Sequence, residues 1–174
     1  MISNSLFLGA QPDLSVEERL GRLEDLESIR NLKSAYALHC DDNYDAEGFR
    51  KLFVDNSTWE SNAFGEYHGI EEIATFIREL PSQIHWALHY MVNPIINLNE
   101  DRTKASGRWI LIEFATMAAV ESSTSSDPEA VIISCAYHDD FVKTADGWRF
   151  ERVRAHFHNV SAWDQGWVKQ QYRE

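Results

Sequence analysis

The sequence predicts an α+β fold in which N-terminal helices pack against a strongly curved, mostly antiparallel sheet and leave a single pocket between them. Three observations lead to this prediction. Apolar residues recur at helical spacing in the first half of the chain, and long segments of strand-like alternation fill the second half. The length of 174 residues suits one domain, which can bury a core without disulfides or metal ions.

The first helix is expected from Ser15 to about Cys40. Ser15 and Glu18 form a capping-box pattern, in which the side chain of each residue caps the backbone N–H of the other. Apolar residues three and four positions apart predict one buried stripe, formed by Ile29, Leu32, Tyr36 and Cys40. A shorter helix is expected after Asp45, with a buried side formed by Phe49, Leu52 and Phe53.

A short hairpin and a third helix follow. Residues 57–61 and the segment around Tyr67 have the alternation of two short strands. The third helix begins after Gly69 and ends at Pro81, whose ring and missing N–H cannot continue a helix. Its buried face is expected to consist of Ile73, Phe76, Ile77 and Leu80.

Four long strands are expected in the second half, over residues 85–98, 105–118, 130–143 and 148–158. Residues 121–128 include four serines and predict a flexible hairpin loop or a lid. We therefore divide the chain into an N-terminal arm, one domain and a C-terminal tail, at residues 1–14, 15–160 and 161–174.

The composition excludes some partners and favours others. The net charge is −12, from 16 basic and 28 acidic residues, so nucleic acid and anionic membranes would repel the chain. Six Trp, six Tyr and nine Phe suit a cavity for an apolar or aromatic ligand. Cys40 and Cys135 form no disulfide framework, and the apolar patch at residues 6–10 is too short for a signal core. We expect a cytoplasmic protein whose arm docks on its own or a neighbouring subunit.

Two histidines four residues apart, His85 and His89, raise the question of a metal site. On a helix they would share a face and could hold one metal ion. On a strand they also share a face, but at a spacing of ~13 Å that one ion cannot bridge. Both periodicities are present, and strand is favoured by the alternation of Trp86, Leu88, Tyr90 and Val92. We therefore expect no metal site.

Asp41 lies where the first helix is expected to end. A carboxylate there meets the negative end of the helix dipole, so the position is locally unfavourable. The residues alone leave two interpretations open. Asp41 is a solvated residue that leads into a turn, or its carboxylate is held in place for a function.

Four segments, taken in order, carry a resemblance to a known family. They read LKSAYALHCD at residues 32–41, HYMVNP at 89–94, GRWILIE at 107–113 and YHDDFVKTADGWRF at 137–150. In this order they resemble the SnoaL-like branch of the nuclear transport factor 2-like superfamily, and within it the bile-acid 7α-dehydratases, scytalone dehydratases and hexachlorocyclohexane dehydrochlorinases. The resemblance spans about residues 20–155 and implies a cone-shaped α+β barrel.

The resemblance also implies a catalytic pair with two helpers. In the dehydratase pattern a Tyr precedes an Asp by five positions, as Tyr36 precedes Asp41, and a His precedes a Pro by five, as His89 precedes Pro94. The acidic residue after the G-R-W motif is an Asp in that pattern and Glu113 here, which lengthens the side chain. The implied roles are a base for His89, an orienting carboxylate for Asp41, and hydrogen-bond donors for Tyr36 and Glu113. No cofactor is implied.

Each of these residues also has a purely structural interpretation. His89 and Tyr36 could be core residues with hydrogen-bonded polar atoms, and Glu113 could pair with an Arg across the sheet. Three aromatic residues are candidates for a substrate pocket and equally for the core: Trp59, Phe64 and Trp86. Arg154 could hold a substrate oxygen, although its face of the last strand is expected to meet solvent or another subunit. That face also carries Arg152, His156 and His158. Tyr137 and Asp139 are assigned to sheet architecture.

The expected function is a cofactor-independent lyase that eliminates water from a hydrophobic cyclic or aromatic small molecule, such as a bile-acid-like compound or an aromatic catabolite. A cofactor-free isomerase and an aryl lyase that releases formaldehyde would use the same kind of pocket. A non-catalytic binding module is the remaining alternative. Because an exposed strand face needs covering, we expect a homo-oligomer. The resemblance implies a trimer, with a dimer as the alternative.

Overall fold

Helix α1 (Val16–Asp41) opens the described part of the chain, which comprises residues 14–120 and 125–173 of a computed structural model. Its cap is the predicted one: the Ser15 hydroxyl accepts from the Glu18 N–H at 3.1 Å, and the Glu18 carboxylate accepts from the Ser15 N–H at 2.7 Å. The predicted stripe of Ile29, Leu32, Tyr36 and Cys40 is buried. Of the expected N-terminal arm, residues 1–13 lie outside the described residues.

Short elements follow α1: helix α2 (Ala46–Arg50), strands β1 (Phe53–Ser61) and β2 (Gly65–His68), helix α3 (Gly69–Glu79) and the 3₁₀ helix η2 (Leu80–Ser82). Asp45 caps α2, because its carboxylate accepts from the N–H groups of Glu47 and Gly48 at 3.2 and 3.1 Å. The α-helix α3 ends two residues before Pro81, as the missing N–H requires. The four apolar residues predicted to be buried on α3 and at its end are buried.

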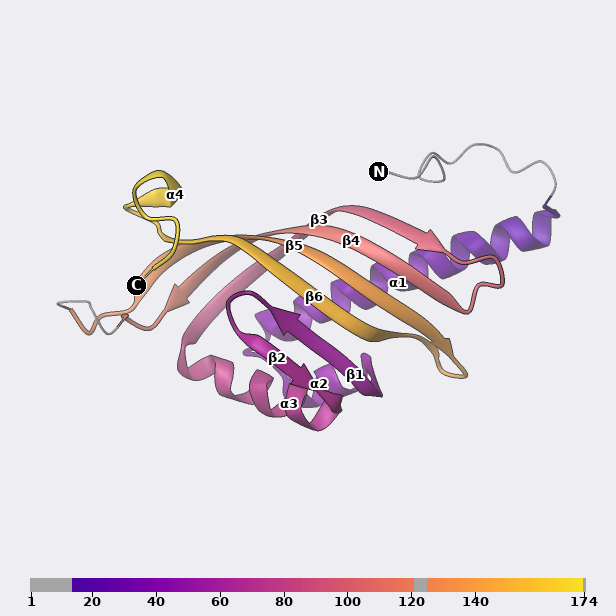
Figure 1. The fold of residues 1–174 in the computed structure, drawn as a ribbon, viewed down its shortest axis with the longest axis horizontal. Coiled ribbons are helices and arrows are strands. Elements are labelled where there is room, and N and C mark those ends of the chain that lie inside the picture. Colours follow the sequence, from indigo (N-terminus) through magenta and orange to yellow (C-terminus); the bar gives the residue numbers. More distant parts are fainter. Residues whose placement is uncertain (1–13, 121–124, 174) are drawn as a thin grey trace.

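The rest of the chain forms four long strands: β3 (Ile84–Leu98), β4 (Lys104–Met117), β5 (Glu129–Thr144) and β6 (Gly147–Ala162). The sheet order is β2-β1-β6-β5-β4-β3, with β1 and β6 parallel and every other neighbouring pair antiparallel. Figure 1 shows these strands curving together, with α1 crossing behind them and α3 beside the β1–β2 hairpin. The predicted fold class is therefore confirmed.

The C-terminal residues return to the sheet. Strand β6 continues to Ala162, four residues beyond its predicted end, and the short helix α4 (Gly166–Lys169) follows. Tyr172 then forms an isolated bridge with Val160, and the Arg173 guanidinium binds the Glu129 carboxylate at 2.6 Å. Of the predicted loop or lid at residues 121–128, residues 121–124 lie outside the described part of the chain.

A buried ionic cluster around Asp25 attaches the first half of α1 to the turns of the sheet. The Asp25 carboxylate accepts from Lys143 and Arg102, each at 2.6 Å, and from the Trp148 ring N–H at 2.9 Å. Burial opposes ionisation of Asp25, but these hydrogen bonds outweigh it and lower the pKa. The cluster orients α1 across the sheet, and thereby aims the other end of the helix at the pocket.

In residues 14–120 and 125–173, no helix has the length and apolar character needed to cross a membrane.

Candidate active site

A pocket lies between α1, α3, the β1–β2 hairpin and the inner face of the sheet. Seven aromatic side chains line it, together with aliphatic residues of α3, β3 and β5. Its polar lining groups include His89 and Glu113, and the hydroxyls of Tyr36, Tyr44 and Tyr137. The cavity has a volume of about 40 Å³, enough for water molecules but not for an aromatic ring. A cyclic ligand therefore requires wall side chains to move.

Asp41 and His89 are joined by two hydrogen bonds. Asp41 is the last residue of α1, and its Oδ1 atom lies 2.8 Å from His89 Nδ1 and accepts from the His89 backbone N–H at 2.9 Å. These bonds explain how a carboxylate is held at the unfavourable end of a helix dipole. Because Nδ1 is bonded to a carboxylate, it carries the proton, and the lone pair of the neutral imidazole is on Nε2.

Glu113 lies on the other side of the imidazole. It is paired with His89 across β3 and β4, and its Oε2 atom lies 3.4 Å from His89 Nε2. The side chains of both residues are almost fully buried, at 5% exposure for His89 and 4% for Glu113. Among the described residues, Glu113 Oε1 has no hydrogen-bond partner. The predicted alternative was an ion pair between Glu113 and an Arg across the sheet, but within residues 14–120 and 125–173 the ion-pair partner of Glu113 is His89.

The pKa values of His89 and Glu113 are both raised, for different reasons. Burial favours neutral His89, but the charges of Glu113 and Asp41 and the hydrogen bond to Asp41 outweigh it and raise the His89 pKa. Burial also raises the pKa of Glu113; the His89 charge opposes this and the Asp41 charge adds to it. Glu113 can therefore hold a proton at a pH where an ordinary Glu is ionised. His89 Nε2 and Glu113 are placed to share that proton.

Tyr36 lies deeper in the same pocket, against Trp59. The Trp59 ring N–H donates to the Tyr36 hydroxyl oxygen at 2.9 Å, and both side chains are buried. This bond occupies one lone pair of the Tyr36 oxygen and does not involve the phenol proton. Trp59 and Phe64 line the pocket, where the sequence analysis placed them. Whether any of these residues binds substrate stays a prediction.

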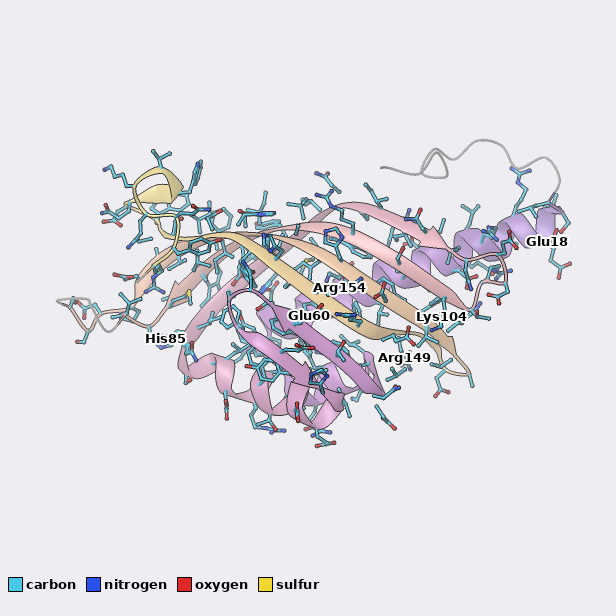
Figure 2. The ribbon with its side chains drawn as sticks, in the orientation of Figure 1. Glu18, Glu60, His85, Lys104, Arg149 and Arg154 are labelled. Carbon is cyan, nitrogen blue, oxygen red and sulfur yellow. The ribbon has the colours of Figure 1, made fainter. Side chains whose placement is uncertain are left out.

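Trp86 does not line this pocket, so its prediction as a pocket wall is wrong. The strand register shifts between Ile84 and Trp86, and both His85 and Trp86 are exposed between buried Ile84 and Ala87. This bulge places two consecutive side chains outside and restores the alternation one residue later. It also separates the two histidines: His85 is exposed at the start of β3 (Figure 2), while the side chain of His89 is almost fully buried. The expectation that they share a face is therefore wrong.

Arg154 is also absent from this pocket, and its prediction as a substrate-binding residue there is wrong. Its neighbours Val153 and Ala155 face inward, so alternation along β6 turns Arg154 to the other face. There its guanidinium donates to the His138 carbonyl at 3.0 Å and pairs with Asp140 at 2.9 Å. Figure 2 shows Arg154 next to Glu60 of β1, with which it is in register. Both residues line a separate open groove of about 610 Å³.

Tyr44 and Lys33 were not among the residues predicted for the site. Tyr44, from the loop between α1 and α2, lines the pocket with its ring 6.2 Å from the His89 ring. Beneath the pocket, the Lys33 ammonium and the Asp139 carboxylate form a fully buried ion pair at 2.8 Å. Lys33 lies 3.5 Å from the centre of the Tyr137 ring. Helical spacing from Ile29 and Tyr36 was a signal for the burial of Lys33, because it lies on their stripe.

No group of three or more His, Cys, Asp or Glu side chains is arranged to hold a metal ion within residues 14–120 and 125–173. Asp41, His89 and Glu113 are instead arranged in a row, with the imidazole between the two carboxyl groups. Such a row can pass protons between a base and an acid.

Comparison with protein families gives one match. The profile of the SnoaL-like domain matches residues 21–154 of this chain. A comparison with curated protein sequences gives no significant match.

Solved structures with the same fold include three informative ones. A hexachlorocyclohexane dehydrochlorinase from Novosphingobium barchaimii is 17% identical, with a TM-score of 0.72, and the match covers 83% of this chain and 93% of that one. A protein named as a scytalone dehydratase from Novosphingobium aromaticivorans is 19% identical, with a TM-score of 0.70 and coverage of 82% and 89%. An NTF2-like protein with a cystatin-like fold, also from N. aromaticivorans, is 24% identical, with a TM-score of 0.64 and coverage of 88% and 95%. At these identities the likeness concerns the fold.

Proposed function

The chain belongs to the SnoaL-like domain family, and from this premise and the geometry of its pocket we propose that it is a cofactor-independent lyase. The proposed reaction eliminates water from a hydrophobic cyclic or aromatic small molecule. One observation carries the proposal: a buried imidazole lies 2.8 Å from one carboxylate and 3.4 Å from a second, in a largely apolar cavity. The names of two structural neighbours, a dehydrochlorinase and a scytalone dehydratase, support elimination chemistry.

The proposed mechanism needs one base and one acid. Neutral His89 accepts the proton of a substrate C–H bond at Nε2, and Asp41 stabilises the imidazolium that forms. The C–O bond breaks, a C=C bond forms, and the leaving hydroxyl takes a proton from Glu113 and departs as water. After turnover His89 holds an extra proton and Glu113 lacks one. The 3.4 Å contact between Nε2 and Glu113 Oε2 is the route by which that proton returns.

Tyr36 is proposed as a second hydrogen-bond donor, to the leaving oxygen or to an enolate. Its oxygen accepts from Trp59, and this bond leaves the phenol proton available for a ligand. Burial raises the pKa of Tyr36 well above its usual value, so the phenol stays protonated at neutral pH and can donate.

Substrate type follows from the pocket wall and the overall charge. Aromatic and aliphatic side chains dominate the lining, which favours an apolar ring system. A chain of net charge −12, with two carboxyl groups at the site, disfavours an anionic substrate. We therefore propose a neutral, hydroxylated cyclic or aromatic compound, in keeping with aromatic catabolism.

Product masses test the proposal against its alternatives. The purified protein is incubated with a panel of hydroxylated steroids, hydroxylated bicyclic ketones and hydroxymethyl phenols, and the products are analysed by mass spectrometry. Loss of water supports the lyase. An unchanged mass with a shifted double bond would indicate an isomerase, and loss of formaldehyde would indicate the deformylating lyase. Binding without any conversion would indicate a binding module and overturn the enzyme proposal.

We further propose that the protein is a cytoplasmic homo-oligomer, with a trimer favoured over a dimer. Two observations support this proposal. Cys40 and Cys135 are both free and buried, as is usual for proteins of a reducing compartment. The face of β3 and β4 opposite the pocket exposes large apolar side chains, which a second subunit would cover. Light scattering coupled to size-exclusion chromatography measures the oligomeric state.

A further inference from the structure

Tyr44 occupies an unusual backbone conformation directly after the end of α1. Asn43 and Tyr44 have φ angles of 53° and 56°, in the left-handed region that asparagine tolerates but that is unfavourable for a bulky aromatic residue. The turn ends the helix: the Tyr44 N–H donates to the Cys40 carbonyl at 3.2 Å, and the Asp45 N–H donates to the His39 carbonyl at 2.9 Å. A glycine would form the same turn without strain, so the helix cap alone does not explain the tyrosine.

The turn directs the ring of Tyr44 into the pocket. The residue is only 6% exposed, and its ring meets the His89 ring edge-on, with centroids 6.2 Å apart and an interplanar angle of 81°. The imidazole is therefore enclosed by Asp41 at one nitrogen, Glu113 at the other and Tyr44 beside the ring. The contact with His89 is made by the ring of Tyr44.

We propose that Tyr44 is a positioning residue of this site, whose ring holds the His89 imidazole between Asp41 and Glu113 and keeps bulk water away from it. The proposal rests on the proposed function in assigning the chemistry to His89. Charges interact more strongly where water is excluded, so the ring maintains the coupling of the imidazole to its two carboxyl partners. The cavity beside the ring, at about 40 Å³, has room for only a few water molecules.

The groups that act on His89 come from several elements, and Tyr44 is the one supplied by a loop. Asp41 and Lys33 belong to α1, and Glu113 belongs to β4. Asp41 and Glu113 favour protonated His89, while Lys33 and burial oppose it. Removing the ring admits water, which reduces the desolvation of His89 and also weakens its interaction with the Asp41 and Glu113 charges. Since the charges prevail in the intact site, we expect the His89 pKa to fall towards its ordinary value of 6.5.

Chemical labelling tests this directly and needs no substrate. Diethyl pyrocarbonate modifies accessible neutral imidazoles, and peptide mass spectrometry measures the rate at each histidine. In Tyr44→Gly, which removes the ring and suits the positive φ, we expect His89 to react about tenfold faster or more than in the wild type. Tyr44→Phe keeps the ring and is expected to react at the wild-type rate. Tyr90→Ala, at an exposed ring next to His89 in the sequence, is the matched control and is also expected to leave the rate unchanged.

NMR titration of His89 in the same variants provides the second measurement. The pKa should fall in Tyr44→Gly and stay at the wild-type value in Tyr44→Phe. Tyr44→Asn, whose side chain tolerates the left-handed region, replaces the glycine variant if that variant does not fold. An unchanged labelling rate and pKa in a folded ring-free variant would overturn the proposal, as would a phenylalanine variant that behaves like the glycine one. Neither result touches the lyase proposal, which product analysis decides separately.

Discussion

The two faces of strands β3 and β4 have opposite characters. On the inner face, His89 and Glu113 are ionisable and almost fully buried. On the outer face, the adjacent residues Tyr90 and Ile112 are apolar, yet 47% and 41% exposed. An antiparallel sheet with one solvated face normally has apolar residues inside and polar residues outside. Over this stretch the chain does the reverse, and neither face is explained by the stability of an isolated subunit.

Both faces of these strands give up stability of the isolated subunit. Burying ionisable groups costs free energy unless partners compensate, and the inner face supplies those partners from α1 and from the neighbouring strand. Exposing rings costs free energy unless another surface covers them. The inner face thus calls for a chemical explanation and the outer face for a partner.

The largest effect is expected at the Asp41–His89 pair. His89→Ala removes the proposed base, and Asp41→Asn leaves the imidazole in the wrong tautomer, so each should lower kcat/KM by ~10²–10⁴-fold. The melting temperature of Asp41→Asn should change little, because the Asp41 side chain is partly solvated. His85→Ala, on the exposed side of the same strand, is the control and should retain wild-type turnover. Wild-type kcat/KM in either pair variant would end the dyad assignment.

The next effect concerns stability rather than rate. Lys33→Met leaves the Asp139 carboxylate buried without its cation, so the free energy of unfolding should fall by about 3–5 kcal/mol. Chemical denaturation measures the change. In the double variant Lys33→Met/Asp139→Leu, both charges are absent and most of the lost stability should return. A double variant as unstable as the single one would show that packing of the lysine stem, and not the unpaired charge, sets the stability.

Glu113→Gln should lower kcat/KM by about 10²-fold, because an amide cannot give a proton to the leaving group. It should also change stability in a pH-dependent way. Burial raises the pKa of folded Glu113 above 4.5. Glu113 therefore makes its full favourable contribution to the free energy of unfolding below pH 4.5, and this contribution is lost as the pH rises through the folded pKa. Glutamine has no such loss. From pH 4 to pH 8 the variant should gain, relative to the wild type, stability of order 1 kcal/mol.

Urea denaturation of wild-type protein and Glu113→Gln at several pH values measures this difference. The stability contribution of His89 has the same pH dependence, because its pKa is also raised and the contribution is also lost as the pH rises. A stability difference that is constant with pH, or that grows towards acid, would contradict the raised pKa of Glu113.

How far the sequence predicts this molecule depends on whether a feature is local. Caps, breaks and periodicity locate the helices and strands, and the family motifs lead to Asp41, His89 and Glu113. Trp86 was misplaced because alternation was extended through a bulge, which arises from strand pairing and has no local signature. Tyr44 was missed for a related reason. A tyrosine in a left-handed turn runs against local preference, and its packing in the pocket beside His89 is a tertiary contact.

The smallest effect on the subunit itself is expected on the outer face. Ile112→Lys lies one residue from Glu113 but points away from the pocket, so it should change the free energy of unfolding of the subunit by less than about 0.5 kcal/mol. It should nevertheless disrupt the proposed oligomer, because Ile112 lies in an apolar surface. Ile112 is in register with Tyr90 across β3 and β4. The ring centroids of Tyr90 and Phe114 are 6.1 Å apart, and those of Phe114 and Trp163 are 5.9 Å apart. A lysine within that apolar surface would leave a buried, unpaired charge in the interface.

Light scattering should detect a lower mass for Ile112→Lys than for the wild type. Lys104→Ala, at a charged position at the far end of the same strand, serves as the control. An oligomer that persists in Ile112→Lys would place the interface elsewhere, and a monomeric wild type would leave the exposed rings without the subunit partner proposed for them.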